Sequence, residues 1–183
     1  MRPQTLGMTT RDYIEFQDRS IPMAYLITFR CYGTWLHGDE RGSMDRRYYN
    51  RYGEAKIIPG AEAKARKAKL LKHEPFFLGE AESRIVDAAL REVCSVRGYA
   101  LFALHVRTEH VHVVPGGFAK PERMMDSFKA YSTKALRAAG LIAVDAKPWS
   151  RHGSTRYLWT EEHIQKAVEY VVNGQGGELP DFD

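Results

Sequence analysis

Apolar residues recur along this chain with two different periods, and each period predicts a kind of element. The run PMAYLITFR, residues 22–30, is rich in Tyr, Ile, Thr and Phe, which favours a β-strand. Over residues 80–96 the apolar positions follow a helical period, and Gly98 marks the end of that helix. The apolar face of this predicted helix holds Ile85, Ala88, Ala89, Val93 and Val96.

The second half of the chain mixes strands and helices. Its pattern predicts two strands, a helix, a strand and a helix, at residues 99–107, 110–114, 120–139, 155–159 and 160–172. Thr108-Glu109 is a tight connection between the first two strands, and Pro115-Gly116-Gly117 should end the second one. Gly140 just past one helix and Thr160 at the start of the other are typical of helix ends.

The core elements follow the order strand, helix, strand, strand, helix, strand, which is the βαββαβ order of a ferredoxin-like α+β sandwich. A long insertion after the first strand, residues 31–80, is punctuated by glycines and prolines and carries one short basic helix near 61–72. The last helix is an addition to this core. We therefore predict a single domain over 1–183, with its core at about 22–172, a loose tail at 173–183, and the third strand internal to the sheet.

Composition narrows the class of protein. With 44% apolar and 27% charged residues among 183, the chain is typical of a globular domain. It holds no apolar run near the roughly 18 residues of a membrane span, and its first residues lack the apolar stretch of a secretory signal. Cys31 and Cys94 have no metal-type spacing and are expected to be reduced thiols. We therefore expect a cytoplasmic protein without a membrane partner.

Positive charge is concentrated in the insertion. Residues 41–73 hold ten Lys or Arg and three acids, a net charge of +7, whereas the whole chain carries +4. A basic segment of this size favours a polyanionic partner. Between residues 46 and 52 arginines are interleaved with tyrosines, so guanidinium groups could follow phosphates while rings stack on unpaired bases. The alternative for this segment is a solvated loop.

We expect DNA contacts from the insertion and from two later segments. The candidates in the insertion are Arg46, Arg47, Tyr48, Tyr49, Arg51, Lys64, Arg66 and Lys67. The later candidates are Lys129, Lys134, Arg151, His152 and Arg156. The last three belong to the run WSRHGSTR, which offers guanidinium groups, hydroxyls and an imidazole beside the fourth predicted strand.

His110 and His112 stand one residue apart in the third predicted strand. Side chains alternate faces along a strand, so both imidazoles share one face while Val111 and Val113 share the other. Two rises of about 3.3 Å put their Cβ atoms roughly 6.5–7 Å apart, within reach of one divalent metal ion. The alternative is a pair of polar residues on a solvated face. His105, one strand earlier, is expected in the core because its neighbours are strongly apolar.

Tyr131 lies in the helix predicted at 120–139. On a helical wheel it falls at the edge of the apolar arc, beside Ser127 and Lys134. Such a position would hold the ring against the core and direct the hydroxyl outward, as a nucleophile requires, with help from a nearby metal or cation. The alternative is a tyrosine that packs its ring and hydrates its hydroxyl.

In combination these features resemble the HUH single-tyrosine transposases, and among them the REP-associated tyrosine transposases. The matching features are a His-hydrophobic-His triplet on a strand and a helical tyrosine about twenty residues later. The segments AYLITFRCYGTWL, ALHVRTEHVHVV and MMDSFKAYSTKALRAAGL carry the resemblance, which covers about residues 22–172. It implies a ferredoxin-like DNA recombination enzyme that binds hairpins in single-stranded DNA and cuts beside them.

By that resemblance, His110 and His112 would hold Mg²⁺ or Mn²⁺ and Tyr131 would attack the scissile phosphate. The products would be a 5′-phosphotyrosine and a 3′-hydroxyl, and reversal against a new 3′-hydroxyl would rejoin strands. The family often places a Gln or Asn one helical turn after the tyrosine as a third ligand, whereas this chain has Ala135 there. A homodimer is one arrangement that the family allows, and a nucleoid-associated bacterial protein is the expected setting.

Three questions stay open from the sequence. The remaining metal ligands could be Glu109, His152, water or the DNA itself. A non-catalytic, domesticated relative could use the same basic insertion to hold structured single strands without cutting them. A histidine-dependent phosphoesterase acting on small nucleotides is a third function, although Val114 stands where the histidine-triad enzymes have a further alternating histidine.

Overall fold

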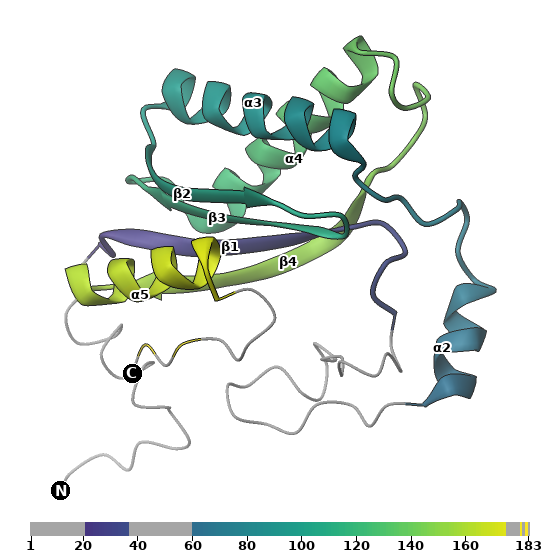
Figure 1. The fold of residues 1–183 in the computed structure, drawn as a ribbon, viewed down its shortest axis with the longest axis horizontal. Helices are drawn as coiled ribbons and strands as arrows, with labels where there is room; N and C mark the ends of the chain where they lie inside the picture. Colours follow the sequence, from purple (N-terminus) through teal and green to yellow (C-terminus); the bar gives the residue numbers. More distant parts are fainter. Residues whose placement is uncertain (1–20, 37–59, 175–179, 181, 183) are drawn as a thin grey trace, which may run out of the picture.

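The computed structural model describes residues 21–36, 60–174, 180 and 182 (Figure 1). Most of the predicted tail and the expected DNA contacts Arg46, Arg47, Tyr48, Tyr49 and Arg51 lie outside these residues. The described elements, in chain order, are β1 (Ala24–Cys31), α2 (Ala61–Ala68), α3 (Glu80–Arg97), β2 (Ala100–Val106), β3 (His110–Gly116), α4 (Pro121–Ala138), β4 (Trp149–Leu158) and α5 (Glu161–Val172).

The four strands form one antiparallel sheet in the order β2-β3-β1-β4. With α3 joining β1 to β2 and α4 joining β3 to β4, this is the predicted ferredoxin-like βαββαβ arrangement. The basic insertion contains α2, and α5 follows the core, as predicted. Strand β3, which carries the two histidines, is internal to the sheet, as predicted.

Local sequence signals set most helix ends. Gly98 ends α3 with φ 67°, and Gly140 follows α4 with φ 69°, a left-handed conformation that glycine adopts without strain. Thr160 caps α5, since its side-chain oxygen accepts a hydrogen bond from the backbone N–H of His163. Pro121 occupies the first turn of α4, where a missing N–H breaks no helical hydrogen bond.

Helices α3 and α4 lie on one face of the sheet, and α5 lies on the other (Figure 1). We call the first the closed face. Its core contains Phe29, Val111, Val113, Leu90 and Phe128, all completely buried. Burial of this apolar surface is the main stabilising contribution to the domain.

Helix α5 forms a second, smaller core on the opposite face. It packs Ile164, Ala167 and Val171 against Leu26 of β1 and Val114 of β3.

Among the helices that the structure describes, none combines the length and the apolar character that a membrane span needs.

Two predicted strand boundaries are wrong. Strand β4 begins at Trp149, well before the predicted start at residue 155. Gly153 allows this early part of β4 to lie close against β1, because a Cβ atom at position 153 would come 2.4 Å from the carbonyl oxygen of Thr28. Strand β3 continues through Pro115 to Gly116, paired with β2. Its ladder with β1 runs only from His110 to Val113, so the missing N–H of Pro115 breaks no hydrogen bond there.

Candidate active site

Helix α5 covers only part of its face of the sheet, and a polar region lies next to it. There, Thr28 of β1 stands directly opposite His112 of β3, and Arg30 stands opposite His110. Residues directly opposite each other in an antiparallel pair project from the same face. We call these four residues the open half-face. Three of them are half-buried, and His112 is 6% exposed.

The two imidazoles of the open half-face lie close together, as the strand period predicted. The ring centroids of His110 and His112 are 4.6 Å apart and the ring planes meet at 81°. The hydroxyl oxygen of Thr28 lies 2.8 Å from Nδ1 of His112. In the tautomer that carries its proton on Nδ1, this N–H donates to Thr28 and leaves the Nε2 lone pair for a metal.

His112 is held in its neutral form. Burial lowers the pKa of His112 to about 3, and the positive charges of His110, Arg30 and Arg107 add to the effect. Metal binding requires a neutral imidazole. His112 therefore meets the first chemical requirement of a ligand at physiological pH.

A tyrosine of α5 faces this histidine pair. The ring of Tyr170 packs edge-on against the ring of His112, with centroids 5.4 Å apart at 79°. The next residue, Val171, is tied to β2, since its carbonyl oxygen lies 3.1 Å from Nδ1 of His105. His105 therefore does not lie within the apolar core as expected: it is half-buried, stands opposite His112, and fixes the last turn of α5.

Tyr131 does not reach the histidines of its own chain. It is half-buried on α4 and packs against the core of the closed face. Val111 and Val113 project to that face and are completely buried, so His110 and His112 project to the other one. The sheet itself separates the two sites within one chain, so the predicted meeting of Tyr131 with a histidine pair would need the histidines of a second copy of the chain.

Sequence reasoning missed Tyr170, although a signal for it was present. The two crossover helices of a βαββαβ unit cover the same face of the sheet. The strand residues most suited to that face are Val111 and Val113, which leaves the histidines for whatever lies on the opposite face. The additional helix α5 is the element that covers it, and Tyr170 is the tyrosine in its last turn.

The residue at the family's third-ligand position and the expected further ligands Glu109 and His152 lie in different parts of the fold. Ala135 lies on α4, on the closed side of the sheet. Glu109 is half-buried directly before β3, and its backbone carbonyl accepts a hydrogen bond from the N–H of Cys31 at 2.8 Å. His152 is exposed on β4. Among the described residues, no three His, Cys, Asp or Glu side chains gather to form a metal site.

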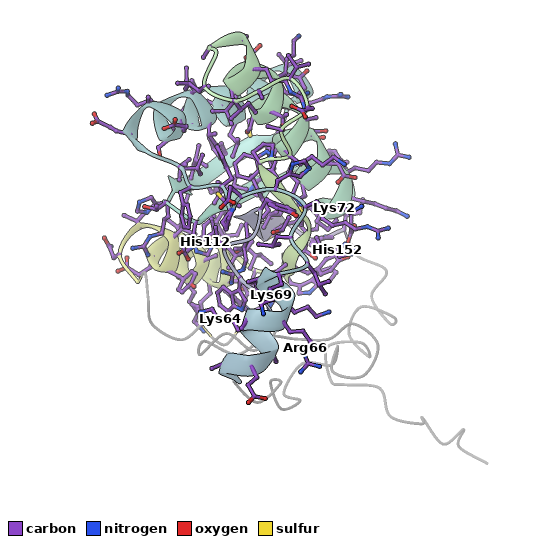
Figure 2. All side chains as sticks on the ribbon, turned by 90° about the vertical axis from the view of Figure 1, so that its right-hand side faces the viewer. Lys64, Arg66, Lys69, Lys72, His112 and His152 are labelled. Carbon is purple, nitrogen blue, oxygen red and sulfur yellow. The ribbon has the colours of Figure 1, made fainter. Side chains whose placement is uncertain are left out.

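The expected DNA contacts in the described part of the chain fall into two groups. Lys64, Arg66 and Lys67 are exposed on α2, which stands apart from the sheet, and Lys69 and Lys72 continue the same basic segment (Figures 1 and 2). Lys134, Arg151 and His152 are also exposed, and Arg156 is half-buried.

Lys129 is the exception, because its ammonium group is engaged within the protein. It donates to the backbone carbonyls of Ser150, Arg151 and His152 at 2.9, 3.4 and 3.2 Å, and burial lowers its pKa. Lys129 therefore braces the irregular start of β4, and its contact with DNA stays a prediction.

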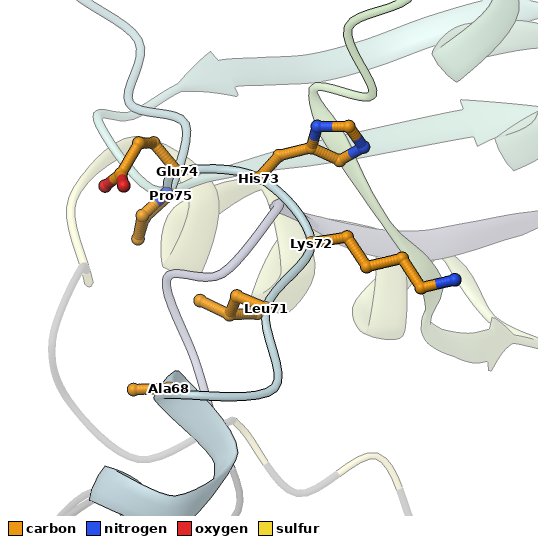
Figure 3. A pocket seen from close by; sticks show the side chains of 6 residues that line it. All are labelled: Ala68, Leu71, Lys72, His73, Glu74 and Pro75. Carbon is orange, nitrogen blue, oxygen red and sulfur yellow. The ribbon is translucent and has the colours of Figure 1, made fainter.

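The segment that leads from α2 back to the core forms a shallow hollow (Figure 3). It is lined by Ala68, Leu71, Lys72, His73, Glu74 and Pro75. The ring of His73 meets that of Tyr32, and the Tyr32 hydroxyl accepts a hydrogen bond from the backbone N–H of Lys72 at 3.0 Å. These contacts fasten the base of the basic helix beside the turn that follows β1.

Comparisons with known proteins find similar folds at low sequence identity. One similar solved structure is a REP-associated tyrosine transposase bound to a REP hairpin, with 14% sequence identity and a TM-score of 0.45. The match covers 82% of this chain and 66% of the transposase chain, which is just under two thirds of the transposase's length. Another is a crystal structure at 1.90 Å of a candidate transposase from Deinococcus radiodurans R1: 13% identity, TM-score 0.47, covering 87% of this chain and 95% of that chain. No family model and no curated protein matches the chain.

Proposed function

We propose that this chain is a metal-dependent DNA strand-cleaving and strand-joining enzyme of the HUH transposase type, with Tyr170 rather than Tyr131 as its nucleophile. One observation carries the proposal: the Tyr170 ring packs against His112 within a polar region that already holds a pair of imidazoles. Hairpin-bearing single-stranded DNA is the substrate implied by the resemblance of the sequence motifs. The exposed basic helix α2 supports a polyanionic substrate.

The reaction would begin when the Tyr170 phenol oxygen attacks the phosphorus of a DNA phosphodiester. A new bond forms between phosphorus and the tyrosine oxygen, and the bond from phosphorus to the 3′-oxygen breaks. The phenol loses its proton, and the departing 3′-oxygen gains one. The phosphotyrosine keeps the phosphoester linkage, so attack by another 3′-hydroxyl joins strands without an external energy source.

His110 and His112 would hold the divalent ion, Mg²⁺ or Mn²⁺. Two close imidazoles, one kept neutral by burial, fit such a group. A bound ion at this position would neutralise charge that develops on the phosphate oxygens. Asn173, about one helical turn after Tyr170, is a candidate oxygen ligand. Its amide nitrogen donates to Glu169 at 2.9 Å, and its carbonyl oxygen is of the type that such ions accept.

Covalent capture tests the proposal. The full chain is incubated with Mn²⁺ and 3′-labelled single strands in which a hairpin is flanked by randomised bases, and products are separated under denaturing conditions. The label stays with the 5′-phosphate, so an adduct carries it to the mass of protein plus DNA. We expect Tyr170→Phe to form no adduct and Tyr131→Phe, the matched change on the closed side, to form it at the wild-type level.

Each other outcome has a definite meaning. Loss of the adduct in Tyr131→Phe alone would transfer the nucleophile to a helix supplied by a second copy of the chain. Hairpin binding by the wild type without any adduct would favour the non-catalytic DNA-holding function instead.

A further inference from the structure

An arginine of the open half-face is held in a fixed orientation beside the histidine pair. Arg30 projects from β1 directly opposite His110, two residues after Thr28. Its guanidinium carbon lies 3.3 Å from the centre of the Trp35 ring. The indole covers one face of the guanidinium, whose planar fork carries the N–H donors, and the Nη1 atom of this fork lies buried.

The turn that brings Trp35 under Arg30 is built from well-defined contacts. Gly33 has φ 75°, which lets the chain reverse directly after β1. The Thr34 hydroxyl donates to the carbonyl oxygen of Cys31 at 3.0 Å, and Thr34 is 9% exposed. The backbone N–H of Cys31 donates to the carbonyl of Glu109 at 2.8 Å, which joins this turn to the start of β3. Trp35 therefore stands on the same framework as the histidines.

The arginine also acts electrically on the same site. Its guanidinium carries a permanent positive charge, and Arg30 stands directly opposite His110 in the sheet. Positive charge at this short range is costly beside a metal ion unless an anion lies between them. A planar guanidinium matches the oxygen geometry of a phosphate, to which it can donate two parallel hydrogen bonds.

We propose that Arg30, oriented by Trp35, is the phosphate-binding residue of this site and holds one DNA phosphodiester next to His110 and His112 through a two-pronged contact. The identification of that phosphodiester as part of DNA rests on the function proposed above. Trp35 acts through Arg30 as a positioning residue.

The test is a coupling measurement between one arginine and one phosphate. Hairpin-bearing strands selected by wild-type binding are prepared with each phosphodiester near the cleavage position replaced, in turn, by an uncharged methylphosphonate. Affinities are measured by fluorescence anisotropy in EDTA, so that cleavage does not interfere. We expect Arg30→Gln to weaken binding of native DNA about tenfold or more, as loss of a charge-assisted contact does. At one position, methylphosphonate should weaken the wild type similarly but leave Arg30→Gln unchanged.

Further variants separate orientation from charge. Arg30→Lys keeps the charge but loses the fork, and should recover only part of the affinity. Trp35→Phe should keep the stack, whereas Trp35→Leu should lower affinity several-fold with the charge intact. Arg84→Gln, on the exposed surface of α3 where Arg84 pairs with Glu80, is the matched control and should bind as the wild type does. Thermal unfolding of each variant establishes that it is folded.

Additive losses from Arg30→Gln and methylphosphonate at every position, or wild-type affinity in Arg30→Gln, would overturn the proposal, and so would a wild type without affinity for DNA. The two proposals fail separately. Binding with phosphate coupling but without an adduct removes the nuclease function and keeps Arg30. If Tyr170 forms the adduct but Arg30→Gln binds DNA as the wild type does, the nuclease function stands and the role of Arg30 is excluded.

Discussion

The two faces of the sheet are formed by the same strands but differ in character: one is an apolar core and the other carries a polar site. On the closed face, α3 and α4 bury an apolar layer that includes Phe29 and Phe128. On the other face, α5 covers an apolar patch and leaves Thr28, His110 and Arg30 half-buried beside it. Because side chains alternate along a strand, one residue step separates a core position from a site position. A polar site can therefore be rigid without lying inside the core, because its side chains project from the same strands whose other face is buried in the core.

The largest difference between the faces should appear in stability. Phe128→Ala on the closed face should lower the free energy of unfolding by about 3–5 kcal/mol, because it removes a completely buried ring. His110→Ala on the open half-face should change it by about 1 kcal/mol or less. Urea unfolding followed by circular dichroism measures both. Equal losses would mean that the open half-face is as much a part of the core as the closed one.

A second contrast concerns buried ionisable groups. Burial raises the pKa of Cys31, on the closed face, to about 12, so the folded state binds its proton more tightly than the unfolded state, whose thiol titrates near 9. The stability that this thiol contributes is complete below pH 9 and is lost as pH rises from about 9 towards 12. We expect Cys31→Ala to show a smaller fall in unfolding free energy over that range.

The quantity to compare is the slope of the unfolding free energy against pH rather than its absolute value, since the alanine substitution also leaves a cavity. Cys94, whose pKa burial raises to about 11, supplies a comparison with a smaller shift. Parallel slopes for Cys31→Ala and the wild type would show that the Cys31 thiol titrates normally and is not sealed in the closed face.

The smallest effect should come from one hydroxyl on the open half-face. Thr28→Val keeps the shape of the side chain but removes the oxygen that lies 2.8 Å from Nδ1 of His112. Loss of a group that orients a ligating imidazole weakens metal binding by about tenfold or more. Calorimetric titration with Mn²⁺ measures the change. Thr155→Val, on β4 opposite Ile27 of the closed face, is the matched control. Equal affinities in the two variants would remove Thr28 from the site.

The sequence alone determined the order of the elements and the placement of His110 and His112 on one face of a strand. Gly98, Gly140 and Thr160 marked helix ends because their preferences act within a single turn. His110 and His112 share a face because strand geometry has a period of two. The start of β4 could not be seen in the same way. Gly153 matters through its close approach to Thr28, a contact 125 positions away along the chain.

Only the tertiary structure decided which tyrosine meets the histidines. Tyr131 and Tyr170 both lie on amphipathic helices, and nothing local to either residue states which face of the sheet its helix will cover. That choice follows from the right-handed crossovers that place α3 and α4 together, and from the apolar layer of Val111 and Val113 that they bury. Periodicity along a strand tells which side chains stand together, whereas the packing of distant helices decides what they stand against.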